Sequence, residues 1–242
     1  MRKPLIGALA TVTALGAVGA AVAATPQFVQ TYELSYTQKK PKKNTGFKTL
    51  ITSADPGDPN GKPAATKQVI VTFAKGTKFD TTVVPQCKST SDKPDEIAAA
   101  CKKSIIGKGT AEANARPLLP LPAKEVITAY NTRNGIIFAL VAAPGAAGQP
   151  LVLRGKLSGG KLVTDVPALV LPGNIKVVLT KFELDIKAQK GKKSGKGRKR
   201  KTKYYALTPA KCTGGSFVTK AQFIYNDGTP SKTIESKSSC KK

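Results

Sequence analysis

The stretch 67-KQVIVTF-73 shows the pattern that decides the fold of this chain. Val69, Val71 and Phe73 occupy every second position, so an extended backbone places them on one face. The same alternation recurs in residues 28–36 and 217–225, where aromatic and aliphatic side chains share one phase. A period of two is typical of half-buried strands, so these segments predict β-structure.

About a dozen such runs follow one another, separated by clusters of Gly, Pro, Asn and Asp. One of them, 135-GIIFALVA-142, is apolar at nearly every position, which predicts a strand buried on both faces. Only 93-KPDEIAAACKK-103 resembles a helix, with a proline and acidic residues at its start and lysines at its end. The chain is therefore expected to be all-β: an antiparallel β-sandwich, Ig-like or jelly-roll-like, with one short helix.

The N-terminus has the pattern of a secretory signal peptide. Arg2 and Lys3 precede an uncharged apolar run, and the small-residue triplet 21–23 ends it. We expect cleavage near Ala23, which leaves residues 24–242 as a single domain that is secreted or associated with the cell envelope. The alternative is a permanent membrane anchor, because the run is close to the length that spans a bilayer.

Four cysteines, Cys87, Cys101, Cys212 and Cys240, are the complete set. An even number in an exported chain predicts disulfides, and three connectivities are possible. We favour Cys87–Cys101 and Cys212–Cys240, because each pair brackets one local segment. A zinc site is disfavoured, since the spacings are not C-x-x-C and the chain contains no histidine.

The formal net charge is +26, which favours a polyanionic partner. The most basic segment is 187-KAQKGKKSGKGRKRKTK-203, in which ten of 17 residues are Lys or Arg and none is acidic. It has almost no apolar surface to bury, so it is expected to be a long, disordered loop between two strands. The predicted contact residues are Lys192, Lys193, Lys196, Arg198, Lys199, Arg200 and Lys201.

The expected partners are an anionic cell-wall polymer, an acidic polysaccharide or an anionic membrane surface. A second lysine cluster, residues 39–43, lies in another expected loop. Nucleic acid would bind only unspecifically, because Tyr204 and Tyr205 at the loop border are the only aromatic side chains positioned to stack on bases. The alternative is that the lysines are passive, and that the domain is structural or binds a protein partner through its sheet faces.

Nothing in the sequence indicates catalysis, a cofactor, a metal or a small-molecule substrate. The absence of histidine excludes Ser-His-Asp and Cys-His mechanisms. A hydrolase without histidine would need Glu183 with Asp185, which share a strand face, or Ser158 with Lys161, which match S-x-x-K. Both pairs have simpler interpretations, as a solvated strand face and a Gly-Gly hairpin turn, so we expect a non-catalytic protein.

Three segments carry a resemblance: 73-FAKGTKFDTTVVPQC-87, 101-CKKSIIGKGTA-111 and 208-TPAKCTGGSFVTKAQFIYNDGTPSKTIESKSSC-240. Together with the signal peptide, they resemble a group of uncharacterised exported proteins of high-GC Gram-positive bacteria. The resemblance implies the same disulfide pairing and a β-sandwich, and it implies no catalytic residue. The basic segment 187–203 looks like an insertion relative to that pattern.

Overall fold

The computed structural model describes residues 28–194 and 201–241, so the expected signal peptide lies outside the described residues. The sheet strands are short and follow one another closely, as the alternation predicted. The elements are β1 (Val29–Tyr36), β2 (Phe47–Ala54), β3 (Thr66–Thr72), β4 (Lys78–Phe79), α1 (Pro94–Ala100), the 3-10 turn η1 (Lys102–Ser104), β5 (Ile105–Asn114), β6 (Ala123–Thr132), β7 (Gly135–Ala142), β8 (Leu151–Ser158), β9 (Lys161–Asp165), β10 (Leu169–Leu171), β11 (Ile175–Ile186), β12 (Lys190–Ser194), β13 (Lys201–Tyr204), β14 (Ala206–Leu207), β15 (Ser216–Tyr225) and β16 (Lys232–Ser239).

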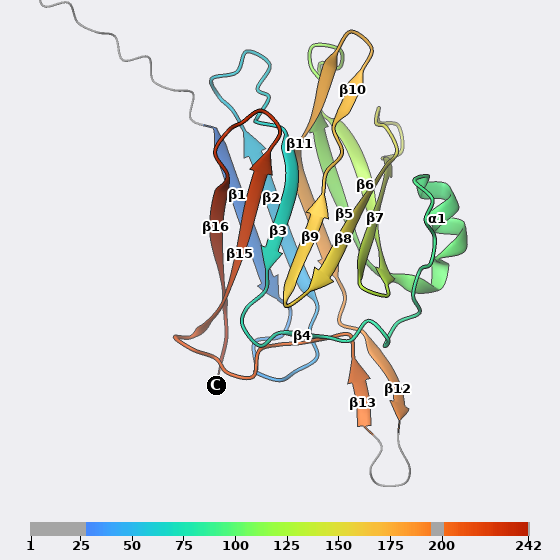
Figure 1. The fold of residues 1–242 in the computed structure, drawn as a ribbon, viewed down its shortest axis with the longest axis vertical. Coiled ribbons are helices and arrows are strands. Elements are labelled where there is room, and N and C mark those ends of the chain that lie inside the picture. Colours follow the sequence, from blue (N-terminus) through green and yellow to red (C-terminus); the bar gives the residue numbers. More distant parts are fainter. Residues whose placement is uncertain (1–27, 195–200, 242) are drawn as a thin grey trace, which may run out of the picture.

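One antiparallel sheet of 12 strands dominates the molecule. Its main path runs β1-β2-β11-β5-β6-β7-β8-β9-β3-β15-β16, and β10 pairs only with β11. In Figure 1 the sheet curls until β16 lies beside β1, with β3, β9 and β15 in front of β2 and β11. The all-β, antiparallel expectation is confirmed. The strands form one nearly closed, barrel-like sheet, called the barrel below, rather than two clearly separate sheets.

The seam between β1 and β16 is closed by side chains. The backbone N–H of Leu34 donates to Ser236 Oγ (2.9 Å), and that of Tyr36 donates to Ser238 Oγ (3.1 Å). The residue numbers on both strands increase together from one bond to the next, so β1 and β16 run parallel. In an antiparallel sheet whose path contains an odd number of strands, the first and last strands run in the same direction, so closure places two parallel strands side by side. The hydroxyls thus satisfy edge N–H groups that would otherwise lack partners.

The barrel interior holds the main core, with alternate residues of each strand facing inward. β7 is buried on both faces, as predicted from its continuous apolar run. Its other face packs under α1, where Ile137 and Ala139 contact Ile97 and the Cys87–Cys101 pair. The helix therefore covers the outer face of β7, as Figure 1 shows. No helix in the described ranges has the length and hydropathy needed to cross a membrane.

Both favoured disulfides are present. Cys87 is bonded to Cys101 beside α1, and Cys212 is bonded to Cys240 at the end of β16. The prediction of a disordered loop over 187–203 is wrong at its two ends, because β12 and β13 pair there as a small antiparallel sheet. Residues 195–200, between these strands, lie outside the described part of the chain.

Candidate polyanion-binding surface

The end of the barrel at which β1 terminates, called the basal end, carries both lysine-rich segments. The β12–β13 hairpin projects from this end, and the connection between β1 and β2 lies beside it (Figure 1). Of the predicted contact residues, Lys192 and Lys193 belong to β12 and Lys201 begins β13. Lys196, Arg198, Lys199 and Arg200 lie outside the described residues, so their predicted role remains a prediction.

The loop 39–43 is held in one conformation by a buried threonine. Thr208 Oγ1 donates to the carbonyl of Lys40 (2.7 Å) and accepts the backbone N–H of Lys43 (2.9 Å). The backbone of the loop bonds the same segment, from Lys42 N–H to the carbonyl of Pro209 (3.1 Å). These bonds occupy backbone groups, so the side chains of all four lysines in the loop are exposed. The loop presents a fixed group of charges.

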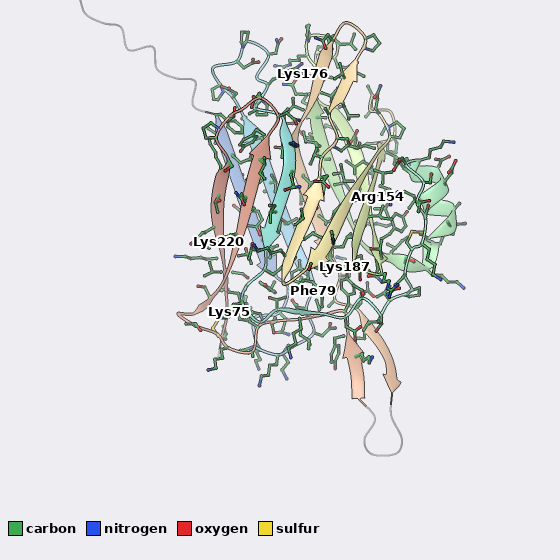
Figure 2. All side chains as sticks on the ribbon, in the orientation of Figure 1. Lys75, Phe79, Arg154, Lys176, Lys187 and Lys220 are labelled. Atoms are coloured by element: carbon green, nitrogen blue, oxygen red, sulfur yellow. A yellow bond between two sulfur atoms is a disulfide. The ribbon has the colours of Figure 1, made fainter. Side chains whose placement is uncertain are left out.

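Further lysines reach the same end from segments distant in sequence. The strand pair β4–β14 places Lys78 opposite Leu207, and Lys241 N–H donates to the carbonyl of Lys39 (3.0 Å). Figure 2 shows Lys75 at this end, opposite to Lys176. We call this set the basal lysine surface, and its exposed members are Lys39, Lys40, Lys42, Lys43, Lys75, Lys78, Lys187, Lys190, Lys203, Lys211 and Lys241.

Only one carboxylate, Asp80, belongs to the segments that form this surface, residues 37–46, 74–84, 187–194 and 201–215. Its pKa is lowered, mainly by a hydrogen bond from the Thr82 hydroxyl and further by Lys203, whose Nζ lies 3.8 Å from Asp80 Oδ2. Asp80 therefore neutralises Lys203 and stays ionised, and Lys187 is paired with Asp185 of β11. The other nine lysines of the surface keep their positive charge, which a repeating anion can neutralise.

The two tyrosines at the border of the basic segment have different surroundings. Tyr205 is fully buried beneath the basal end, with its ring 6.4 Å from that of Phe79. Tyr204 is partly exposed. Because a buried ring cannot stack on a base, only one of the two is available, which argues further against a reader of single-stranded nucleic acid.

Glu183 and Asp185 share the outer face of β11, as their spacing predicted. Glu183 lies 3.4 Å from Lys181 Nζ, and Asp185 pairs with Lys187. Both carboxylates line a wide concavity on the outside of β16, β1, β2, β11 and β5. Each is paired with its own lysine. Glu183 is exposed, which fits a solvated strand face, whereas Asp185 is half-buried, with one carboxylate oxygen that has no partner among the described residues.

Ser158 and Lys161 lie opposite each other at the β8–β9 turn. The two residues between them, Gly159 and Gly160, have φ of +57° and +76°, which glycine adopts without strain. The hairpin-turn interpretation of this S-x-x-K match is therefore confirmed.

Sequence reasoning missed Thr208, which fixes the loop 39–43, and Ser236 and Ser238, which close the seam. It also missed Glu125, a carboxyl that faces the barrel interior. A signal for Glu125 was present, because it shares the phase of Ala123, Ile127 and Ala129 in β6.

Comparison with family models, curated proteins and solved structures finds no match to the chain.

Proposed function

We propose that this protein is exported, non-catalytic and attached to anionic polymers of the cell envelope through the basal lysine surface. The observation that carries the proposal is the gathering of exposed lysines at one end of the barrel from five separate parts of the chain: residues 39–43, 75–78, 187–190 with Lys203, Lys211 and Lys241. A passive distribution of solubilising lysines has no reason to concentrate at one end, where only Asp80 and Asp185 pair with members of the surface. Two disulfides fit an oxidising compartment.

The ligand expected for this surface is a flexible chain of phosphate or carboxylate groups. Lysine ammonium groups are point charges without the planar fork of arginine, and the described part of the surface consists of lysines. Such contacts provide charge neutralisation with little selectivity for a particular monomer. Affinity should therefore fall steeply with salt concentration, through release of counterions from the polymer.

The test is binding of long-chain polyphosphate across a salt series, with polygalacturonate as the carboxylate arm and anionic lipid vesicles as the membrane arm. The variant K39Q/K40Q/K42Q/K43Q removes four charges and leaves the backbone bonds to Thr208 in place. If these lysines each contact one anionic group, the slope of log K against log salt should decrease by about 3. The salt concentration at which half of the protein remains bound to polyphosphate should also fall.

The matched control is K67Q/K93Q/K124Q/K176Q, which removes the same charge from exposed lysines away from the basal end. It should leave the slope nearly unchanged. Equal loss in the two variants would show that net charge alone drives binding and would reject the basal lysine surface. Stronger retention on vesicles than on either polymer would assign the surface to a membrane.

A further inference from the structure

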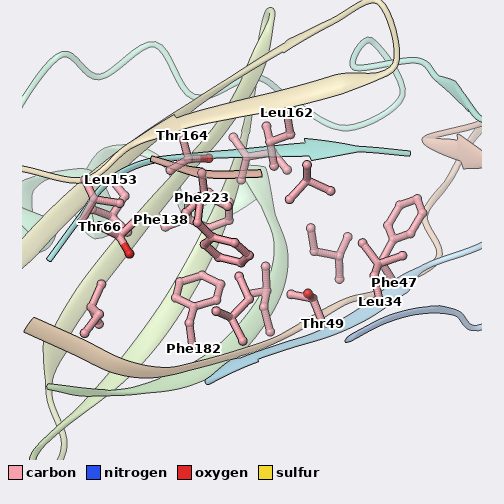
Figure 3. Close-up of a pocket in the computed structure, with 18 of the residues that line it drawn as sticks. Leu34, Phe47, Thr49, Thr66, Phe138, Leu153, Leu162, Thr164, Phe182 and Phe223 are labelled. Carbon is pink, nitrogen blue, oxygen red and sulfur yellow. The ribbon is translucent and has the colours of Figure 1, made fainter. Parts of the chain in front are cut away.

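The barrel contains an apolar chamber of about 110 Å³. Figure 3 shows Phe47, Phe138, Phe182 and Phe223 on strands that face one another around this space. Its lining extends along β3 from Thr66 to Phe73, which is roughly 23 Å of extended chain. An apolar cavity of roughly 150 Å³ holds benzene, so this smaller and elongated chamber suits a short alkyl chain better than a ring.

A narrow neck lies at the end of the chamber away from the lysines. The neck and the chamber share Thr66, Val166 and Leu179 in their linings. The neck in turn shares Leu169 and Asn226, among others, with a wider cleft of about 500 Å³, called the mouth. Chamber, neck and mouth therefore follow one another from the interior of the barrel to its surface.

Glu125 is the only charged side chain in the lining of the neck. It lies on β6 opposite Ala111 of β5 and Ala142 of β7, and only 4% of its surface is exposed. The loop 143–150 passes over it, since a Cβ at Gly148 would come within 3.4 Å of Glu125 Cγ. Burial alone raises the pKa of this carboxyl to about 7, with no hydrogen bond or cation among the described residues acting on it.

A buried carboxyl without a partner is costly, and an apolar residue would fill the same position without that cost. At the opposite end of the chamber, a second polar group lacks a hydrogen bond: the buried hydroxyl of Tyr205 has no partner among the described residues. A buried polar group without a partner calls for one. Tyr205 lines the chamber, whereas Glu125 lines the neck that adjoins it, where its carboxylate oxygens keep some contact with solvent.

The charge near the neck differs from that of the rest of the molecule. The mouth carries Asp55, Asp58 and Asp227 against Lys62 and Lys176. With Glu125 ionised, the linings of the neck and the mouth hold four carboxylates and two ammonium groups, in a chain whose net charge is +26. Lys232 lies at the edge of the mouth, with its Nζ 4.3 Å from the centroid of the Phe28 ring, so the preference for a cation rests on Glu125 in the neck.

We propose that the barrel binds a small organic amine, whose apolar body occupies the chamber and whose ammonium group pairs with Glu125 in the neck. Glu125 and the mouth lie at the end of the barrel opposite to the basal lysine surface, so the two proposals are tested independently. The apolar lining accounts for the body of the ligand, and the unpaired carboxyl accounts for its head group.

The probe is hexylamine, titrated calorimetrically into the full chain at pH 8, with 1-hexanol, hexanoate and ethylamine as comparison compounds. Hexylamine should bind at least ten-fold more tightly than each of the three, because hexanol and hexanoate lack the cation and ethylamine is too short to fill the chamber. Glu125→Gln should weaken hexylamine binding at least ten-fold and leave hexanol binding unchanged. The matched control Glu112→Gln, on neighbouring β5 opposite Lys124, should bind hexylamine like the unaltered chain.

Several outcomes would overturn the proposal. Absence of hexylamine binding, equal binding of hexylamine and hexanol, equal binding of ethylamine, or an unaltered affinity in Glu125→Gln would each do so. If Glu125→Gln does not fold, the unaltered chain still decides the matter. Its affinity for hexylamine should fall about ten-fold between pH 8 and pH 6 while that for hexanol stays constant, and an affinity independent of pH would reject the pairing. The other charged groups of the tract are the five at the mouth, Asp55, Asp58, Lys62, Lys176 and Asp227.

Discussion

At the scale of single residues, the buried carboxyl of Glu125 lowers the stability of the barrel at neutral pH. Glu125 faces inward at a position where its neighbours on the strand are apolar, and burial raises its pKa to about 7. The folded state therefore holds a proton that the unfolded state releases at a lower pH. Stability associated with this group is complete below about pH 4.5 and is lost as the pH rises through 7.

Replacing Glu125 with Gln should remove this pH dependence. The free energy of unfolding of the variant should match that of the unaltered chain near pH 4.5 and exceed it by about 2 kcal/mol at pH 8, since solvent in the neck screens part of the full effect. Urea unfolding at the two pH values measures the difference. Glu112→Gln is the control, and a Glu125→Gln difference that stays constant across pH would contradict the assigned burial.

The buried hydroxyl of Thr208 stabilises the basal end. Thr208→Val keeps the shape of the side chain and removes the hydroxyl that joins Lys40 and Lys43. We expect a loss of about 1–3 kcal/mol in the free energy of unfolding, because two backbone groups lose a buried partner. Hydrogen exchange of the Lys43 amide should accelerate, whereas protection of the β6 amides in the native state should remain.

At the level of elements, the closure of the barrel depends on two strands that do not pair through their backbones. The hydroxyls of Ser236 and Ser238 replace the missing ladder between β16 and β1. In S236A/S238A, the N–H groups of Leu34 and Tyr36 lose their acceptors, which should cost about 1–3 kcal/mol in total. Amide exchange at these two residues should speed up first, because the seam opens before the rest of the sheet.

Ser239→Ala is the control for this seam, since Ser239 is exposed at the end of the same strand. It should leave both exchange and stability nearly unchanged. If the amides of Leu34 and Tyr36 exchange as slowly in S236A/S238A as in the unaltered chain, β1 and β16 are held together by their buried side chains alone.

On the scale of the whole molecule, charge is distributed unevenly along the barrel axis. The basal end gathers lysines, whereas the opposite end of the barrel carries most of the exposed large apolar side chains, Val29, Leu118, Leu121, Val141 and Val170. Crowded like charges repel each other, and salt screens this repulsion: the Debye length falls from about 30 Å at 0.01 M to about 10 Å at 0.1 M.

The Tm should therefore rise between 10 and 150 mM NaCl, and K39Q/K40Q/K42Q/K43Q should show a smaller rise than K67Q/K93Q/K124Q/K176Q. Differential scanning fluorimetry measures both, with sucrose in place of salt to separate screening from general stabilisation. An identical salt response in the two variants would mean that the lysines at the base are too far apart to repel each other.

Local sequence was sufficient for the strands, the helix and the disulfides. The alternation in KQVIVTF and the continuous run in GIIFALVA predicted β3 and β7, because the period of side chains along an extended backbone is a local property. The same is true of the proline and acids that begin α1. Cys87–Cys101 and Cys212–Cys240 were favoured correctly, because each pair closes a short segment.

The closed sheet, the shared end of the lysine segments and the inward position of Glu125 came from tertiary structure. Alternation says which residues share a face, but it does not say which strand pairs with which. The pairings β2–β11 and β3–β15 join segments far apart in the chain, and they bring residues 39–43 to the same end as β12–β13. Such pairings depend on the packing of the complete sheet and leave no trace in any single segment.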